Sequence, residues 1–316
     1  MLIRMIPFLF VVLWASGFIG GKLGLQYAEP ATLLSLRMIA NVVLFLLLVA
    51  FLRRRLPTGK LFWHSCMVGV LLHGFYIGGS YLAISLGMPA GLCSLLVGTQ
   101  PIVTALLLVG FSQERFNLAQ WLGLSLGFIG ISLVLMGNIE WQSEQHQWLA
   151  IMASVFALVG ITLGTLYQKK FCQGVDMIGG ATVQYLAAAC VFIPYAASFE
   201  TMHIEWSGEF IFAMVWLVVV LSCCAILLLL YMVEHGAASS VASVFYLVPP
   251  TTAIQAWLIF DERFDWFGAL GFALAAMAVY LVVKKPELRT LTTKLKPAPK
   301  GAPITSLEKL TDNERL

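Results

Sequence analysis

Charged residues are scarce in this sequence. Only 11% of the 316 residues are Asp, Glu, Lys or Arg, whereas 60% are hydrophobic. About a quarter of the residues of a soluble domain are charged, because polar atoms must cover the surface of a compact body. So apolar a chain cannot hide its side chains in one soluble core, which excludes a cytosolic enzyme and predicts a membrane protein.

Two further classes of protein are excluded by what the sequence lacks. A net charge of +3 without a basic stripe offers little to hold the phosphates of a nucleic acid. The six cysteines include no C-x-x-C pair and no Cys/His cluster with the spacing of metal ligands. We therefore predict no nucleic-acid partner, no metal and no cofactor, and we interpret the cysteines as small buried hydrophobic residues.

Ten apolar stretches are long enough to cross a membrane. A hydrocarbon layer of roughly 30 Å requires about 20 apolar residues in a helix. The first stretch lies where a signal peptide would, but it is long, carries Lys22 and is followed at once by a second stretch, so we interpret it as a membrane helix. The predicted fold is an all-α integral membrane protein whose spans are Met5–Leu25, Ala31–Leu52, Ser65–Leu86, Gly91–Phe111, Ala119–Gly137, Trp148–Tyr167, Ile178–Ala197, Phe210–Tyr231, Ala237–Ile259 and Trp266–Val283.

Lys and Arg residues fall almost entirely on one side of the predicted membrane. The side of the N-terminus holds fourteen of them near the spans, whereas the other side holds Arg263 alone and nine acidic residues. Because cytoplasmic loops carry an excess of Lys and Arg, this predicts a multi-pass protein of the cell (inner) membrane with both termini in the cytoplasm. That orientation requires an even number of spans, and ten satisfies it.

An internal repeat relates the two halves of the chain. A shift of 148 positions superimposes the tripeptide Glu114–Phe116 on Glu262–Phe264, and nearly the same shift carries Arg37 to Gln184, while the other early spans match weakly. Five spans per copy is an odd number, so the second copy must insert upside down, which predicts ten transmembrane helices as two inverted five-helix repeats. The predicted domains are residues 1–138, residues 148–284 and a polar, disordered cytoplasmic tail over residues 285–316.

Several short motifs add to this pattern. They are the L-W-A-S-G-F run of Leu13–Phe18, Arg37, the Pro89–Gly91 stretch ahead of a helix interrupted by Pro101, and the repeated E-R-F tripeptide. In these features the chain resembles the ten-helix members of the drug/metabolite transporter superfamily that carry two EamA repeats, over about Met5 to Val283. The resemblance implies movement of a solute without naming it, because members carry amino acids, related metabolites, drugs or sugars. Inverted repeats agree with this, since they let one fold open to either side.

Three ionisable side chains, apart from Cys and Tyr, lie within the spans: Lys22, Arg37 and His73. Charges inside a membrane are costly unless they face a cavity or reach an interface, so each is a candidate site residue. Lys22 and Arg37 could attract a carboxylate of the solute, and Arg37 is suited to bidentate binding. Alternatively, both side chains reach the outer surface near Glu29, or Arg37 joins helices through backbone carbonyl groups.

His73 titrates more easily near neutral pH than any other residue of the spans, so a proton-coupled mechanism would use it. The alternative is a neutral histidine that is hydrogen-bonded across helices. No Asp or Glu lies within the ten spans, which argues against a carboxylate relay for protons or sodium and leaves facilitated diffusion open.

Neutral polar and aromatic side chains at mid-depth complete the predicted substrate-binding set. They cannot all face lipid at low cost, because unpaired polar groups are expensive in hydrocarbon. Amides pair with polar solutes and aromatic rings provide flat apolar walls, although some of these residues only join helices. The set consists of Trp14, Ser16, Tyr76, Gln100, Gln184, Tyr185 and Gln255.

Pro101 and Pro249 stand at matching positions of the two copies, and each removes a helix hydrogen bond. Carbonyl groups freed in this way are tolerated only against protein or a wet cavity. The helices that contain the two prolines are therefore the predicted gates.

Nothing in the sequence predicts catalysis, because the spans lack paired carboxylates and a Ser/His/acid set at one depth. We expect a secondary transporter, monomeric or homodimeric among membrane lipids, that exports a small-molecule substrate by alternating access. The expected substrate is an amino acid or a related amphipathic compound, with its polar end recognised by Arg37, Gln100 and Gln184. The alternatives are a permease for a sugar, a nucleotide sugar or a lipid precursor, and a membrane receptor or assembly factor that transports nothing.

Overall fold

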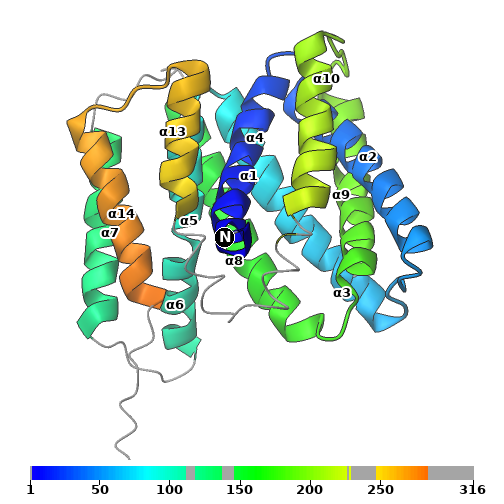
Figure 1. Ribbon diagram of the computed structural model, residues 1–316, viewed down its shortest axis with the longest axis horizontal. Helices are drawn as coiled ribbons and strands as arrows, with labels where there is room; N and C mark the ends of the chain where they lie inside the picture. Colours follow the sequence, from blue (N-terminus) through cyan, green and yellow to red (C-terminus); the bar gives the residue numbers. More distant parts are fainter. Residues whose placement is uncertain (1, 112–117, 137–145, 226–227, 229–246, 284–316) are drawn as a thin grey trace, which may run out of the picture. The chain divides into compact units, whose positions relative to one another are not determined.

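Ten membrane helices make up the described part of the chain, as the sequence predicts (Figure 1). The computed structural model describes residues 2–111, 118–136, 146–225, 228 and 247–283. Seven helical stretches in these ranges are by themselves long and apolar enough to cross a membrane. The predicted span Ala237–Ile259 is described only from Leu247 onward, the predicted span Phe210–Tyr231 only in part, and the tripeptide Glu114–Phe116 lies outside the described residues.

Three of the ten helices are divided into segments. The third consists of α3, η1 and α4, the fourth of α5 and α6, and the eighth of α10 and η3. In chain order the elements are α1 (Leu2–Gly24), α2 (Pro30–Phe51), α3 (Lys60–Gly69), η1 (Val70–Ile77), α4 (Gly78–Ser85), α5 (Ala90–Gly98), α6 (Gln100–Phe111), α7 (Leu118–Met136), α8 (Gln147–Phe171), α9 (Met177–Phe199), α10 (Gly208–Val215), η3 (Trp216–Ala225), α13 (Val248–Phe260) and α14 (Trp266–Val283).

The helices pack in the pairs that two inverted repeats require. α2 packs against α9, α5 against α13, and α7 against α14, and in each pair the two helices hold the same position in their repeats (Figure 1). The segments α3, η1 and α4 pack against α8, and α10 and η3 pack against α1. In both contacts the third helix of one repeat packs against the first helix of the other repeat. The packing therefore follows a two-fold relation between the halves.

Connecting segments fix the starts of α2 and α9. The carboxylate of Glu200, directly after α9, accepts hydrogen bonds from the backbone N–H groups of Ala31 (2.8 Å) and Thr32 (2.7 Å) in the first turn of α2. At the start of α9, Asp176 accepts a hydrogen bond from the N–H of Gly179 at 2.9 Å. Carboxylates suit these positions because helix N-termini carry unpaired N–H groups and a partial positive charge.

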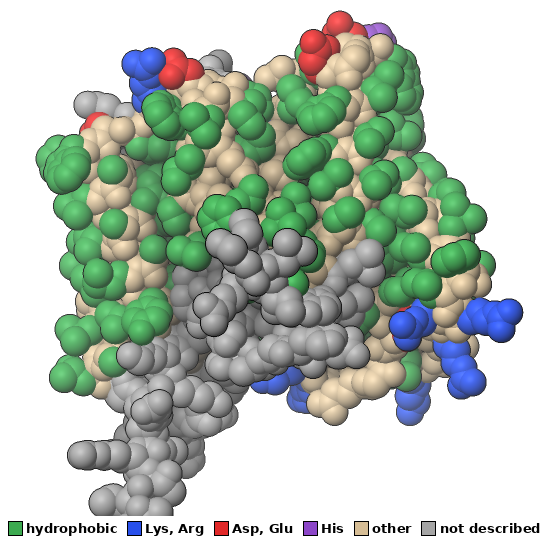
Figure 2. Space-filling view, in the orientation of Figure 1, with side chains coloured by type: hydrophobic (Ala, Val, Ile, Leu, Met, Phe, Trp, Pro, Cys, Tyr) green, Lys and Arg blue, Asp and Glu red, His purple; other side chains and the backbone are tan. Residues whose placement is uncertain are grey.

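The outward-facing side chains are strongly apolar, whereas charges collect at the two ends of the helices (Figure 2). Phe8, Trp63, Phe128 and Trp148, from four different helices, are each at least 65% exposed. Large rings spread over so many faces suit contact with lipid rather than water. The exposed charges at one end include Arg53, Arg54, Arg55, Lys60, Lys169 and Lys170, and those at the other end include Glu205, Glu209, Asp261 and Arg263.

Candidate binding cavity

Two π-helical segments line the candidate site. The shift of 148 positions that relates the repeats carries Val70 to Val218 and Ile77 to Ala225, so η1 falls within η3. π-Helical turns are rare and occur frequently at functional sites. Both repeats therefore carry the same irregular feature at equivalent positions, although the sequence match there is weak.

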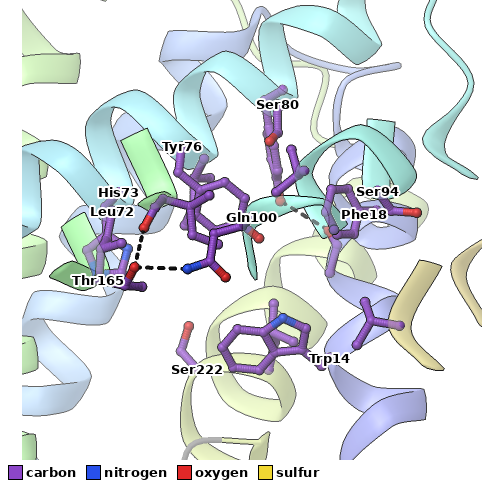
Figure 3. Close-up of a pocket in the computed structure, with 18 of the residues that line it drawn as sticks. Trp14, Phe18, Leu72, His73, Tyr76, Ser80, Ser94, Gln100, Thr165 and Ser222 are labelled. Carbon is purple, nitrogen blue, oxygen red and sulfur yellow. Dashed lines mark hydrogen bonds between the residues drawn. The ribbon is translucent and has the colours of Figure 1, made fainter. Parts of the chain in front are cut away.

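A cavity of about 440 Å³ is lined by helices of both repeats (Figure 3). Its walls are mainly apolar and aromatic, with a few polar groups, which is typical of sites for small molecules. The lining residues are Trp14, Gly17, Phe18, Arg37, Leu72, His73, Tyr76, Ile77, Ser80, Tyr81, Ser94, Val97, Gly98, Gln100, Pro101, Ile161, Thr165, Gln168, Tyr185, Leu221, Ser222, Val248 and Pro249.

Arg37 is the one permanently charged side chain among the described residues that line the cavity. It is only 5% exposed, and its Nη1 donates a hydrogen bond to the hydroxyl of Tyr81 at 2.8 Å. Its Nε has no hydrogen-bond partner, and no carboxylate lies within 4.0 Å of the guanidinium in the described ranges. The cavity thus contains a buried positive charge without a counter-charge from those residues.

Tyr81 reaches Arg37 because a glycine on α1 leaves room for its ring. A Cβ atom built on Gly21 would lie 2.5 Å from Cζ of Tyr81. The guanidinium carbon of Arg37 lies 5.9 Å from the centroid of the same ring, within reach of a cation–π interaction. α1, α2 and α4 therefore meet at the charged group of the site.

His73 lies beside Tyr185 at the cavity wall. The two ring centroids are 4.6 Å apart at an interplanar angle of 35°, and Nδ1 of His73 has no hydrogen-bond partner among the described residues. Gln184 does not line the cavity. Its backbone packs directly against Gly69, so Gln184 stands behind the wall where α9 meets α3.

Gln100 lies at the break between α5 and α6. Its Nε2 donates hydrogen bonds to the hydroxyl groups of Thr165 (3.0 Å) and Thr104 (3.3 Å), and Figure 3 shows the first of these. Thr165 in turn donates to the carbonyl of Ile161 at 2.8 Å. Because the amide N–H groups of Gln100 donate to these threonines, its amide oxygen stays available as a hydrogen-bond acceptor for a ligand.

The two predicted helix breaks meet in space. α5 ends at Gly98 and α6 begins at Gln100, so Pro101 occupies the first turn of a new helix, where its missing N–H is tolerated. Pro249 likewise lies in the first turn of α13. A Cβ atom built on Gly98 would lie 2.6 Å from Cγ of Pro249, so only glycine permits this approach. Whether the two helices act as gates stays a prediction.

Lys22 does not line the cavity. Its Nζ forms an ion pair with Glu262 at 2.6 Å, and the two residues are 5% and 8% exposed. The same carboxylate accepts hydrogen bonds from the N–H groups of Ala90 (2.9 Å) and Gly91 (3.3 Å) at the start of α5. Lys22 therefore joins α1, α5 and the connection between α13 and α14, a role that the sequence did not suggest.

Ser16 and Gln255 connect helices rather than line the cavity. Ser16 donates to the carbonyl of Leu13 at 2.6 Å and accepts a hydrogen bond from Nε1 of Trp216 at 2.8 Å. Gln255 donates from Nε2 to the carbonyl of Val12 at 2.9 Å. Six of the ten predicted binding residues thus line one cavity, namely Trp14, Arg37, His73, Tyr76, Gln100 and Tyr185.

Among the polar residues of the cavity wall that sequence reasoning missed are Tyr81, Thr165 and Ser222. Tyr81 carried the clearest signal, because it is a polar aromatic residue inside an apolar span, like Tyr76. The two hydroxyl residues carried none, because Ser and Thr are common in membrane helices and bond to their own backbone. Ser222, for example, donates to the carbonyl of Leu217 at 3.0 Å.

Comparison with known proteins agrees with the repeat. A family model described as the EamA-like transporter family matches residues 3–136 and again residues 147–284. A solved crystal structure superimposes with a TM-score of 0.61 at 17% sequence identity, covering 88% of this chain and 94% of that chain. At this identity the likeness supports the fold alone.

Three curated relatives are similar over half of the chain or more. The "Probable amino-acid metabolite efflux pump" of Escherichia coli (strain K12) is 24% identical over 286 residues, which cover 87% of this chain and 92% of the relative. The "Uncharacterized transporter YdfC" of Bacillus subtilis (strain 168) is 29% identical, but this chain spans only 53% of its length and matches over 52% of its own. The "Uncharacterized inner membrane transporter YedA" of Escherichia coli (strain K12) is 23% identical over 59% of each chain.

Proposed function

Because the chain belongs to the EamA-like transporter family, we propose that it exports a small amphipathic metabolite, an amino acid or a related compound, by alternating access. The two family matches cover most of the chain and make it a multi-pass membrane transporter rather than an enzyme. The finer assignment is carried by the cavity, where apolar and aromatic walls surround one buried guanidinium. Such walls suit an apolar body, and the guanidinium suits an anionic end.

The direction and the solute class draw support from a relative that is named as a probable amino-acid metabolite efflux pump. Another relative is named as an inner membrane transporter, which supports the same location here. The exposed Arg53–Arg55 run and the pair Lys169–Lys170 lie at one end of the helices, and the positive-inside rule assigns that end to the cytoplasm. Both termini are then cytoplasmic.

The contacts at the two ends support a state that is closed to the outside. At the acidic end, the ion pair between Lys22 and Glu262 joins α1 to the start of α5. Toward the basic end, the cavity lining reaches Gln168, next to Lys169. In the opposite state the helices would swing about the breaks at Gly98 and Pro249, as two inverted repeats allow.

Flux into proteoliposomes tests this proposal. The purified chain is reconstituted, and a panel of labelled amino acids and metabolites is offered with and without a pH gradient. We expect at least one solute to move, and Arg37→Ala to abolish that movement because the buried cation is lost. Arg263→Ala, at the exposed acidic end, is the matched control and should leave flux unchanged. If no solute moves under any gradient, the transport function is wrong.

A further inference from the structure

Among the described residues, the charges around the cavity do not balance. Arg37 contributes one buried positive charge, and none of the described lining residues is Asp or Glu. The other cation within the predicted spans, Lys22, is neutralised by Glu262 at 2.6 Å. A charge that is removed from water without a partner is costly, so Arg37 favours the uptake of one negative charge.

One edge of the Arg37 guanidinium, formed by Nε and Nη2, has no hydrogen-bond partner among the described residues. Nη1 is engaged by the hydroxyl of Tyr81, whereas neither Nε nor Nη2 donates to any residue that the structure describes. The N–H groups on these two nitrogens point in parallel and match the two oxygens of a carboxylate. The Tyr81 hydrogen bond holds the other side of the fork and thereby fixes the direction of this edge.

The other described residues of the cavity offer no counter-charge for an amine. Its described acceptors are neutral, such as the amide oxygen of Gln100 and the hydroxyl of Ser222. A free ammonium group would enter a cavity of about 440 Å³ that already contains a cation, and the low dielectric would strengthen their repulsion. The indole of Trp14 and the side chain of Leu221 instead provide apolar surface for the body of a solute.

We infer that the cavity selects solutes with a net negative charge: a carboxylate on an apolar body whose amine is absent or acylated. This inference rests on the proposed transport function. It narrows the substrate class from zwitterionic amino acids to monoanions, because only a monoanion neutralises Arg37 without adding a new charge.

Competition within one series of compounds tests the inference. The reporter is the flux of whichever panel solute moves fastest in proteoliposomes. The competitors are phenylalanine (zwitterion), N-acetylphenylalanine (anion), phenylalanine methyl ester (cation) and N-acetylphenylalanine amide (neutral), which share one apolar side chain. We expect the anion to inhibit at a concentration at least about tenfold lower than the other three, because a charge-assisted hydrogen-bond pair contributes enough binding free energy for that difference.

Variants of Arg37 connect that preference to the guanidinium. In Arg37→Gln the four competitors should fall within about twofold of one another, whereas Arg37→Lys should keep part of the preference because it keeps the charge. Gel filtration and thermal unfolding confirm that each variant is folded. Three results would each overturn the inference while transport itself stands. They are inhibition by the zwitterion or the ester equal to that by the anion, no inhibition by the anion, and an anion preference that survives in Arg37→Gln. Absence of any reporter flux would instead refute the proposed function.

Discussion

At the scale of single residues, Tyr81 orients the charge on which recognition in the cavity depends. Its hydroxyl accepts the Nη1 hydrogen bond of Arg37 at 2.8 Å, and its ring lies under the guanidinium. Without that hydrogen bond the guanidinium could rotate, so the Nε–Nη2 edge would no longer be held in one direction. Tyr81 therefore acts on the substrate through Arg37.

We predict that Tyr81→Phe raises KM for transport about tenfold with little change in kcat, because a hydrogen bond to a charged group contributes roughly 1.5–3 kcal/mol. The ring stays in place against Gly21, so the protein should remain folded. Initial rates of flux at several solute concentrations measure the effect. Tyr195→Phe, at an exposed position on α9, is the matched control. An unchanged KM would show that the hydroxyl does not orient Arg37.

Several residues of the cavity were predictable from the sequence because their residue types are rare in membrane spans. Arg37, His73 and Gln100 stand out because ionisable and amide side chains are uncommon in apolar spans, and all three line the cavity. Their partners were not predictable in the same way. Tyr81 lies 44 positions from Arg37, and Glu262 lies 240 positions from Lys22, so each contact depends on helix packing that no local pattern encodes.

At the scale of helices, the contact between α5 and α13 depends on one missing side chain. Gly98 ends α5 against the ring of Pro249, the first-turn proline of α13. Both residues line the cavity, so the contact between α5 and α13 shares its atoms with the binding site. Any motion of one break must therefore change the wall of the cavity.

We predict that Gly98→Ala lowers flux at least about tenfold, because the new Cβ atom would lie 2.6 Å from Cγ of Pro249, where only a shift of backbone can relieve the clash. The two helices should move apart and the break should stiffen. Flux in proteoliposomes measures the effect. Gly208→Ala, where a Cβ atom would meet nothing within 4 Å, is the matched control. Flux at the normal rate in Gly98→Ala would remove this contact from the mechanism.

The helices themselves were largely predictable, whereas their irregular segments were not. Apolar runs of about 20 residues locate the spans, although the third helix begins at Lys60 rather than at the predicted Ser65. Nothing in the residues of η1 indicates a π-helix, because the hydrophobic pattern of Val70–Ile77 is also compatible with an α-helix. The wider winding becomes evident only where η1 packs between α8 and α9.

At the scale of the whole molecule, the two repeats are related in sequence but differ in their present contacts. Lys22 lies in the last turn of α1, and Lys169 and Lys170 lie in the last turn of α8, the corresponding helix of the second repeat. Lys22 is buried in an ion pair with Glu262, whereas Lys170 is exposed, with its ammonium 5.2 Å from the ring of Phe171. In a transporter that alternates between two conformations, corresponding residues of the two repeats have different surroundings in either conformation. Exchange of these surroundings between the repeats would produce the second conformation.

Loop charges predict the orientation, and several residue matches, one tripeptide among them, predict the repeat. The state of the molecule could not be predicted. Both states have the same sequence, and they differ only in which contacts are formed. The equivalence of η1 with η3 was not predictable either, because the two segments match weakly in sequence. Packing fixes the geometry of a buried helix, whereas several hydrophobic residue types can fill the same position.

We predict that Glu262→Gln opens the acidic end of the cavity. Loss of one partner from a buried ion pair costs roughly 3 kcal/mol, which shifts a two-state equilibrium on the order of 100-fold. The readout is an impermeant maleimide added to the acidic side of oriented vesicles, with the six native cysteines replaced and a single cysteine introduced by Ser94→Cys in the cavity wall. Labelling should rise several-fold in Glu262→Gln, because the start of α5 is no longer tied to α1.

The neighbouring acid provides the control for that experiment. Asp261 is exposed and, within the described ranges, its only ion pair is with the exposed Arg263 at 3.0 Å, so Asp261→Asn removes one negative charge from the same turn without touching α5. Its labelling should match that of the unmodified chain, since exposed ion pairs contribute little. If Asp261→Asn and Glu262→Gln label alike, charge alone governs access and the ion pair does not close the outer end. If only Glu262→Gln labels faster, closure depends on the contacts that this one carboxylate makes to Lys22 and to the N–H groups of Ala90 and Gly91.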